Sequence, residues 1–312
     1  MEPIKIGSTV PVEKIHNIIE KFSFKKSLNI NYEVYNDRFV YSFMLDNRNP
    51  DSDIVLYNSI ANFVYDIIMD FYSNKIIDLR INKFLYNIEG LKKSKVIEEV
   101  NRILLDKKEF VYEKEVFKND LLGYLIDNNT LIIDGYLAFR PKSFNNLIDK
   151  AIEKTVDKIY LIIEYNEYID TLQFFVDTQY SQVELVNILI IKDNIQLLDS
   201  YNNKINNKEI SGLLKEIFQE EVSEADIILS SLLALAPQMI VIHGEGYEDS
   251  ELVLVLMEIF QNRVRICSGC DLCALNSIEI KNTESWRYQL FFFDFFFIND
   301  IIVEKKVVEV IN

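Results

Sequence analysis

The stretch that decides the fold of the C-terminal part is MIVIHGEGYEDSELVLVLMEIFQNRVRICSGCDLC, residues 239–273. It opens with an apolar run at 239–243, continues with a helical pattern at 250–260 and ends in a second β-like run at 263–267. A strand, a helix and a strand in this order predict a β-α-β unit whose two strands run parallel in one sheet. The cysteines then follow the carboxyl end of the last strand, where α/β sheets commonly build ligand sites.

All three cysteines of the chain lie in this stretch, as Cys267, Cys270 and Cys273. Their C-x2-C-x2-C spacing includes a glycine, so a tight turn can direct three thiolates towards one point, as a soft metal ion or an iron–sulfur cluster requires. A fourth ligand can come from His243, which ends the neighbouring predicted strand, or from Asp271 inside the motif. The sequence therefore predicts a metal site, with zinc as the expected ion.

Two other interpretations of the cysteines stay open. An iron–sulfur cluster is the first, although the ferredoxin-like spacing C-x2-C-x2-C-x3-C places its fourth cysteine at Ser277. A C-x2-C pair that oxidises reversibly is the second, and three reduced thiols without any chemistry are the alternative to both.

Upstream of the β-α-β unit, some segments have apolar residues at helical spacing and others have them at the spacing of a strand. Residues 29–35 and 39–45 predict a β-hairpin around the Asn36-Asp37-Arg38 turn. Helices are predicted at 53–89, 91–106, 108–127, 209–220 and 224–235. Residues 143–179 predict one long helix or two helices broken near Asn166, and residues 183–191 and 195–198 predict a second hairpin around Asp193-Asn194.

These elements predict an α+β fold in three regions. Residues 1–180 are mainly helical with an N-terminal hairpin, and residues 181–273 form an α/β unit of a hairpin plus the β-α-β unit, ending in the cysteine-rich turn. Residues 274–312 form a Phe-rich, hairpin-like extension to which no role is assigned. Its run at 290–298 is interrupted by Asp294 and is too short for a bilayer span, which needs ~20 apolar residues, so we expect no stable membrane insertion.

Composition limits the location and the partners of the protein. The chain of 312 residues has 49 acidic and 33 basic residues and a formal net charge of −16, so its surface should repel nucleic acid. The first 30 residues carry no signal-peptide pattern, and three clustered cysteines do not form a disulfide framework. We therefore expect a cytoplasmic protein.

Other patterns of catalytic residues are weak. The sequence has no G-x-S-x-G elbow and no phosphate-binding glycine motif, so the His243-Gly-Glu-Gly246 segment does not predict a hydrolase. Four acids recur on one face of the 143–179 helix, where a solvated stripe is the expected role and a cation or acid–base site the alternative: Glu164, Glu167, Asp170 and Asp177.

Four segments carry a resemblance to a known family: EYNEYIDTLQFFVDTQ (164–179), DIILSSLLALAP (226–237), IVIH (240–243) and RVRICSGCDLC (263–273). In them the chain resembles the YtxC-like proteins of endospore-forming bacteria. The resemblance implies a sporulation context and a cytosolic location, in a family without an established biochemical activity. Together with the cysteines it leads us to expect a non-catalytic interaction or regulatory protein that has an unidentified protein partner and a Cys-based metal site.

Overall fold

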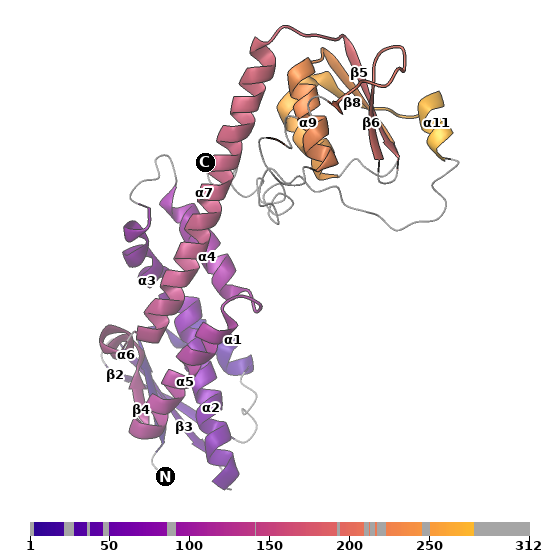
Figure 1. Cartoon of the computed structure of the whole chain (residues 1–312). Helices are drawn as coiled ribbons and strands as arrows, with labels where there is room; N and C mark the ends of the chain where they lie inside the picture. Colours follow the sequence, from indigo (N-terminus) through magenta and orange to yellow (C-terminus); the bar gives the residue numbers. More distant parts are fainter. Residues whose placement is uncertain are drawn as a thin grey trace. The chain divides into compact units, whose positions relative to one another are not determined.

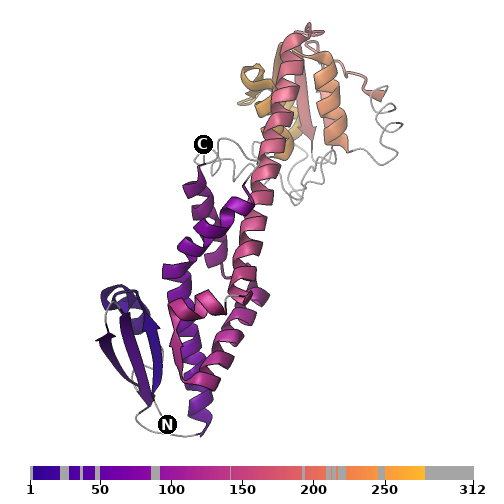
Figure 2. The same ribbon diagram turned by 90° about the vertical axis from the view of Figure 1, so that its left-hand side faces the viewer.

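The structure is a computed structural model, shown in Figure 1 and turned by 90° in Figure 2. It describes residues 3–21, 28–35, 38–45, 50–85, 92–140, 142–191, 194–208, 223–244 and 250–277, together with Gly212 and Glu216. The chain divides into two compact units, which we call the N-terminal unit (Met1–Tyr160) and the C-terminal unit (Leu161–Glu309).

A four-stranded sheet in the order β2-β3-β1-β4 begins the N-terminal unit. Its strands are β1 (Ile4–Ser8), β2 (Leu28–Tyr35), β3 (Arg38–Leu45) and β4 (Thr130–Ile132). β3 pairs antiparallel with β2 and β1, whereas β4 pairs parallel with β1. Ile4 and Ile6 of β1 and Tyr41 and Phe43 of β3 are buried, and Phe63 of the next helix packs edge-on against Tyr41 and Phe43. The alternating pattern thus gives the sheet one apolar face.

Helices form the rest of the N-terminal unit. They are α1 (Val12–Lys21), α2 (Pro50–Ile67), the π-helix η2 (Ile68–Tyr72), α3 (Ser73–Arg80), the 3-10 turn η3 (Ile81–Lys83), α4 (Lys93–Leu105), α5 (Val111–Asn128) and α6 (Ile133–Phe139). Phe117 of α5 lies in their aromatic core, with its ring centroid 4.9 Å from Phe144 and 5.8 Å from Tyr65. The helices are amphipathic and bury their apolar faces against one another.

One helical stretch, Asp53–Lys83, is long and apolar enough to cross a membrane by length and composition alone. Half of the most apolar 18-residue segment in this stretch is buried inside the protein. Ile60, Val64 and Ile67 are fully buried. This is the pattern of a core helix.

A long helix, α7 (Lys142–Thr178), begins in the N-terminal unit and continues into the C-terminal unit. It runs without a break through Asn166, so the predicted stretch forms one helix, which ends at Thr178. In the C-terminal unit, two of its side chains bond to α10 (Glu251–Phe260). The Tyr165 hydroxyl donates to the Glu258 carboxylate (2.8 Å), and the Gln173 amide donates to the Glu258 carbonyl oxygen (2.8 Å).

The sheet of the C-terminal unit has the order β6-β5-β7-β8. Its strands are β5 (Leu185–Ile191), β6 (Asn194–Leu198), β7 (Met239–His243) and β8 (Val264–Ile266). β5 and β6 are antiparallel, and β7 pairs parallel with both β5 and β8. The remaining elements are α9 (Glu224–Leu235), α10, the 3-10 turn η4 (Gln261–Arg263) and α11 (Asp271–Ser277).

The structure confirms the α+β class and the mainly helical N-terminal half. It also confirms both pairs of hairpin strands and the parallel β-α-β unit. Among the elements that were not predicted are β1, β4, α6 and α11. Arg38 and Asn194, expected in the two turns, are the first residues of β3 and β6, because their backbones pair with Tyr35 and Ile191. Several predicted parts lie outside the described residues: Asn36 and Asp37 of the first turn, Asp193 of the second, most of the 209–220 helix and the extension from 278 onward. The three-region division stays a prediction.

Candidate metal centre

Two neighbouring parallel strands bring His243 and Cys267 to the same edge of the C-terminal sheet. His243 is the last residue of β7, and Cys267 directly follows β8. The Cys267 backbone N–H donates to the Ile242 carbonyl oxygen (2.9 Å), which extends the ladder between the two strands by one bond. The carboxyl ends of the strands therefore fix the position of both residues.

A short turn and the first turn of α11 place the other two cysteines. Gly269 has φ +125°, a conformation that residues with a Cβ rarely adopt, and it lets the chain reverse between Cys267 and Cys270. The Ala274 N–H then donates to the Cys270 carbonyl oxygen (2.9 Å), the first bond of the helical pattern. Cys273 thus lies in a helix rather than in a turn, within one helical turn of Cys270.

The four side chains converge. One ligand atom from each of His243, Cys267, Cys270 and Cys273 lies within 4.8 Å of the other three. The His243 Nδ1 atom is 3.3 Å from the Cys270 sulfur and 3.6 Å from the Cys273 sulfur, and these two sulfurs are 3.8 Å apart. In the part of the chain that the structure describes, no other group of three or more His, Cys, Asp or Glu residues has this convergence. Asp271, the other predicted ligand, is exposed at the start of α11 and is not part of the group.

The surroundings of these groups differ. His243 is only 5% exposed, and burial lowers the pKa of its imidazole, so the neutral ring is favoured. The pKa of the exposed Cys270 thiol is lowered, first by the hydrogen bond from the Cys273 backbone N–H. Burial raises the pKa of the Cys273 thiol. A neutral imidazole and a readily ionised thiol are the protonation states that metal binding needs.

A further polar side chain contacts this group, and the sequence did not predict it. The Asn187 Oδ1 atom lies 3.1 Å from His243 Nε2, and the Asn187 Nδ2 atom donates to the Asp199 carbonyl oxygen (3.2 Å). Asn187 is the only polar residue of β5, in a run that otherwise consists of Leu, Val and Ile. That single interruption was the signal in the sequence.

The acidic stripe of α7 does not form a site. Glu164, Glu167 and Asp170 are exposed, and Asp177 pairs with Arg263 (2.7 Å) at an exposed position. The four acids therefore have the solvated role that was expected.

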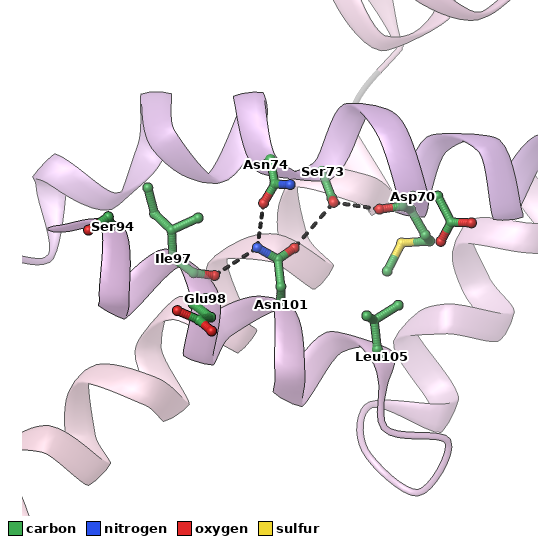
Figure 3. A pocket seen from close by; sticks show the side chains of 9 residues that line it. Asp70, Ser73, Asn74, Ser94, Ile97, Glu98, Asn101 and Leu105 are labelled. Atoms are coloured by element: carbon green, nitrogen blue, oxygen red, sulfur yellow. Dashed lines mark hydrogen bonds between the residues drawn. The ribbon is translucent and has the colours of Figure 1, made fainter. Parts of the chain in front are cut away.

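A shallow pocket of about 410 Å³ lies between α3 and α4 in the N-terminal unit (Figure 3). The Ser73 hydroxyl donates to the Met69 carbonyl oxygen (2.5 Å), and the Asn101 amide donates to Asn74 Oδ1 (2.5 Å) and the Ile97 carbonyl oxygen (2.7 Å). The Ser73 hydroxyl and the Asn101 amide thus bond to protein atoms, as Figure 3 shows. The pocket has no set of convergent ligand atoms comparable to that around His243.

A hydroxyl cluster lies at the carboxyl ends of the parallel strands β1 and β4. The Tyr72 hydroxyl, at the end of η2, lies 3.1 Å from the Ser8 hydroxyl and accepts from the Thr9 N–H (3.3 Å). It donates to one oxygen of Asp134 (3.4 Å), and the Thr9 hydroxyl donates to the other (3.2 Å). The four side chains therefore satisfy one another.

Comparison with known proteins gives one match. The model of the YtxC-like family matches residues 58–265. This range contains His243 and Asn187 and ends two residues before Cys267. No curated protein and no solved structure matches the chain. Because the family model covers more than half of the sequence, the chain belongs to the YtxC-like family.

Proposed function

We propose that this protein is a non-catalytic interaction or regulatory protein of the sporulating cell, and that one zinc ion orders the end of its C-terminal unit. Cys267, Cys270, Cys273 and His243 are the ligands. The observation that carries the proposal is the convergence of their four ligand atoms within 4.8 Å.

Three of the six distances between the four ligand atoms match the edges of a site around a single ion. With zinc–sulfur bonds of roughly 2.3 Å and zinc–nitrogen bonds of roughly 2.0 Å, a tetrahedral site has sulfur–sulfur edges of about 3.8 Å and sulfur–nitrogen edges of about 3.5 Å. The corresponding distances are 3.8 Å between the Cys270 and Cys273 sulfurs, and 3.3 and 3.6 Å from these sulfurs to His243 Nδ1. The soft sulfur donors and the imidazole are ligands that zinc prefers.

The number of ligands supports a structural role. Structural zinc sites have four protein ligands, whereas catalytic zinc keeps one position open for water or substrate. With His243 as the fourth ligand the set is closed. The ion would join the end of β7 to the start of α11, and so stabilise the turn between them.

A thiol-redox function is the second candidate. It is supported by the 3.8 Å between the Cys270 and Cys273 sulfurs and by the lowered pKa of Cys270, since the thiolate is the reactive form. A [4Fe–4S] cluster fits less well, because each of its thiolates binds a different iron and the sulfurs are held farther apart than around one ion.

Metal analysis of protein purified without oxygen tests the proposal. We expect about one zinc per chain, no visible absorption, and loss of the zinc in a Cys267→Ser/Cys270→Ser/Cys273→Ser variant. A Ser268→Ala variant, changed in the same turn, is the matched control and should retain zinc. An iron–sulfur spectrum would favour the cluster instead. Zinc and iron no higher than in the triple variant would contradict any metal site.

The cellular part of the proposal rests on family membership and is tested separately. We expect cells that lack the protein to form fewer heat-resistant spores, and the triple Cys→Ser variant to restore them less well than the Ser268→Ala control. Equal restoration by both variants would show that the role of the protein in sporulation does not depend on its cysteines.

A further inference from the structure

Asn187 is placed by the sheet to meet the ring of His243. In the parallel pair of β5 and β7, Asn187 is in register with Val241, and His243 lies two residues further along β7. Residues in register, and residues two apart on one strand, have side chains on the same face of a sheet. Asn187 and His243 therefore share a face, and they are 7% and 5% exposed.

The orientation of the Asn187 amide is fixed from its other side. The Asp199 carbonyl oxygen, directly after β6, can only accept hydrogen bonds, so the amide atom 3.2 Å away must be the nitrogen. Asp199 is itself held in its loop, because its carboxylate accepts from the N–H groups of Tyr201 and Asn203, at 2.8 Å each. The Asn187 oxygen is consequently directed at His243.

The orientation of the amide selects the tautomer of the imidazole. Asn187 Oδ1 is an acceptor and lies 3.1 Å from Nε2, so Nε2 must carry the hydrogen of the neutral ring. Nδ1 is then left with its lone pair, and it is Nδ1 that lies 3.3 and 3.6 Å from the Cys270 and Cys273 sulfurs. The nitrogen that can bind a metal thus faces the thiols.

We infer that Asn187 is the positioning residue of the metal centre: through its amide oxygen it holds His243 as the Nε2–H tautomer, so that Nδ1 is the metal ligand. This inference deepens the proposed function and rests on it. A metal-bound histidine commonly donates its second ring N–H to an oxygen, and that partner fixes the tautomer and the ring orientation.

A purely structural role for Asn187 makes a different prediction. A buried amide in an apolar strand costs stability unless it is hydrogen-bonded, and an apolar side chain would suit the other residues of β5. If Asn187 only joined β5 to the Asp199 loop, its replacement would change stability but leave the affinity for metal and the tautomer unchanged.

Nitrogen-15 NMR of histidine-labelled full-length protein tests the tautomer without any substitution. The chain contains only two histidines, His16 and His243, so a His16→Gln variant assigns the spectrum. We expect Nε2 of His243 to carry the hydrogen in reduced, metal-free protein, and Nδ1 to shift when zinc is added. A ring that carries its hydrogen on Nδ1 would overturn the inference, whether or not zinc binds.

Zinc titration of an Asn187→Leu variant tests the consequence for binding. We expect an affinity 10–100-fold lower, the loss typical of partners that orient a ligand. Asn187→Asp keeps an acceptor for Nε2–H and should stay within about tenfold of the natural protein. Val241→Ala is the control for disturbed packing at the same register position.

The two proposals fail differently. If the natural protein binds no zinc, the proposed function fails, and the NMR measurement still decides whether Asn187 sets the tautomer of His243. If the natural protein binds zinc and folded Asn187→Leu binds it equally well, the inference alone is wrong. Should the leucine variant not fold, the NMR tautomer and the Asn187→Asp titration decide.

Discussion

The two units place polar groups at the same position of a sheet but use different chemistry there. In the N-terminal unit, the carboxyl ends of β1 and β4 carry hydroxyls and a carboxylate, and hydrogen bonds between Tyr72, Ser8, Thr9 and Asp134 satisfy them. In the C-terminal unit, the carboxyl ends of β7 and β8 carry an imidazole and thiols. Sulfur is a weak hydrogen-bonding atom but a strong ligand for soft metals, so this second edge can hold an ion, whereas the polar groups of the first edge bond to one another.

The largest expected effect is a loss of stability in the N-terminal unit that leaves metal binding unchanged. Phe117 is fully buried between aromatic rings of the N-terminal unit, so Phe117→Ala should lower the free energy of unfolding by about 3–5 kcal/mol. Urea titration followed by circular dichroism measures the loss. The zinc content of the folded variant should stay unchanged, because no ligand belongs to this unit. A variant that folds at low temperature but loses its zinc would break the comparison.

A smaller effect, restricted to the C-terminal unit, depends on pH. Glu251 is 8% exposed, and burial, with the nearby Asp226 carboxylate, raises its pKa from 4.5 to about 7. The folded protein favours the protonated form of Glu251. The contribution of this carboxyl to the free energy of unfolding is therefore complete below pH 4.5 and is lost as the pH rises through 7. Glu251→Gln should therefore raise the free energy of unfolding by up to about 3 kcal/mol at pH 8 and change it little at pH 4.

Thermal melts of the Glu251→Gln variant at pH 4, 6 and 8 measure this dependence. Glu164→Gln, at an exposed position of α7, is the matched control and should have the pH profile of the natural protein. A Glu251→Gln variant with the same gain in melting temperature at all three values would contradict the buried, protonated carboxyl.

The smallest effect concerns the hydroxyl cluster. Tyr72→Phe removes the hydroxyl that contacts Ser8, Thr9 and Asp134. The fully buried Ser8 hydroxyl then lacks that partner. We expect the free energy of unfolding to fall by about 1–2 kcal/mol, since a neutral hydrogen bond contributes about 1 kcal/mol. Urea titration and zinc analysis of the same samples check both units. An increase in stability would show that the cluster is strained rather than satisfied.

Sequence alone predicted the parts of the fold that have a strong period. The alternation at 29–45 and the β-α-β pattern at 239–267 were sufficient to identify four strands and their directions. β4 was missed because three residues, Thr130–Ile132, carry no period. It becomes a strand only through pairing with β1, where Gly7 lets Ile132 approach to within 3.3 Å of the position of a Cβ.

The candidate site shows the same division. The spacing of the cysteines and the place of His243 on a parallel neighbour were readable as pattern, and the structure brings these four residues together. The polar interruption at Asn187 was visible in the sequence, but its contact with His243 was not, because that contact depends on the register between β5 and β7 and on the loop that holds Asp199. Register is a tertiary property, and single residues on a strand do not report it.

The bond that an ion would make between His243 and Cys270 has a further consequence for the unfolded chain. His243 ends β7 and Cys270 follows β8, so the ion would close a loop of roughly 30 residues. A covalent crosslink around a loop of that length lowers the entropy of the unfolded state by an amount equivalent to about 3–4 kcal/mol. A disulfide makes such a crosslink permanent, whereas protons, chelators and oxidants can each open this one. The end of the C-terminal unit would then follow the zinc supply and redox state of the cell.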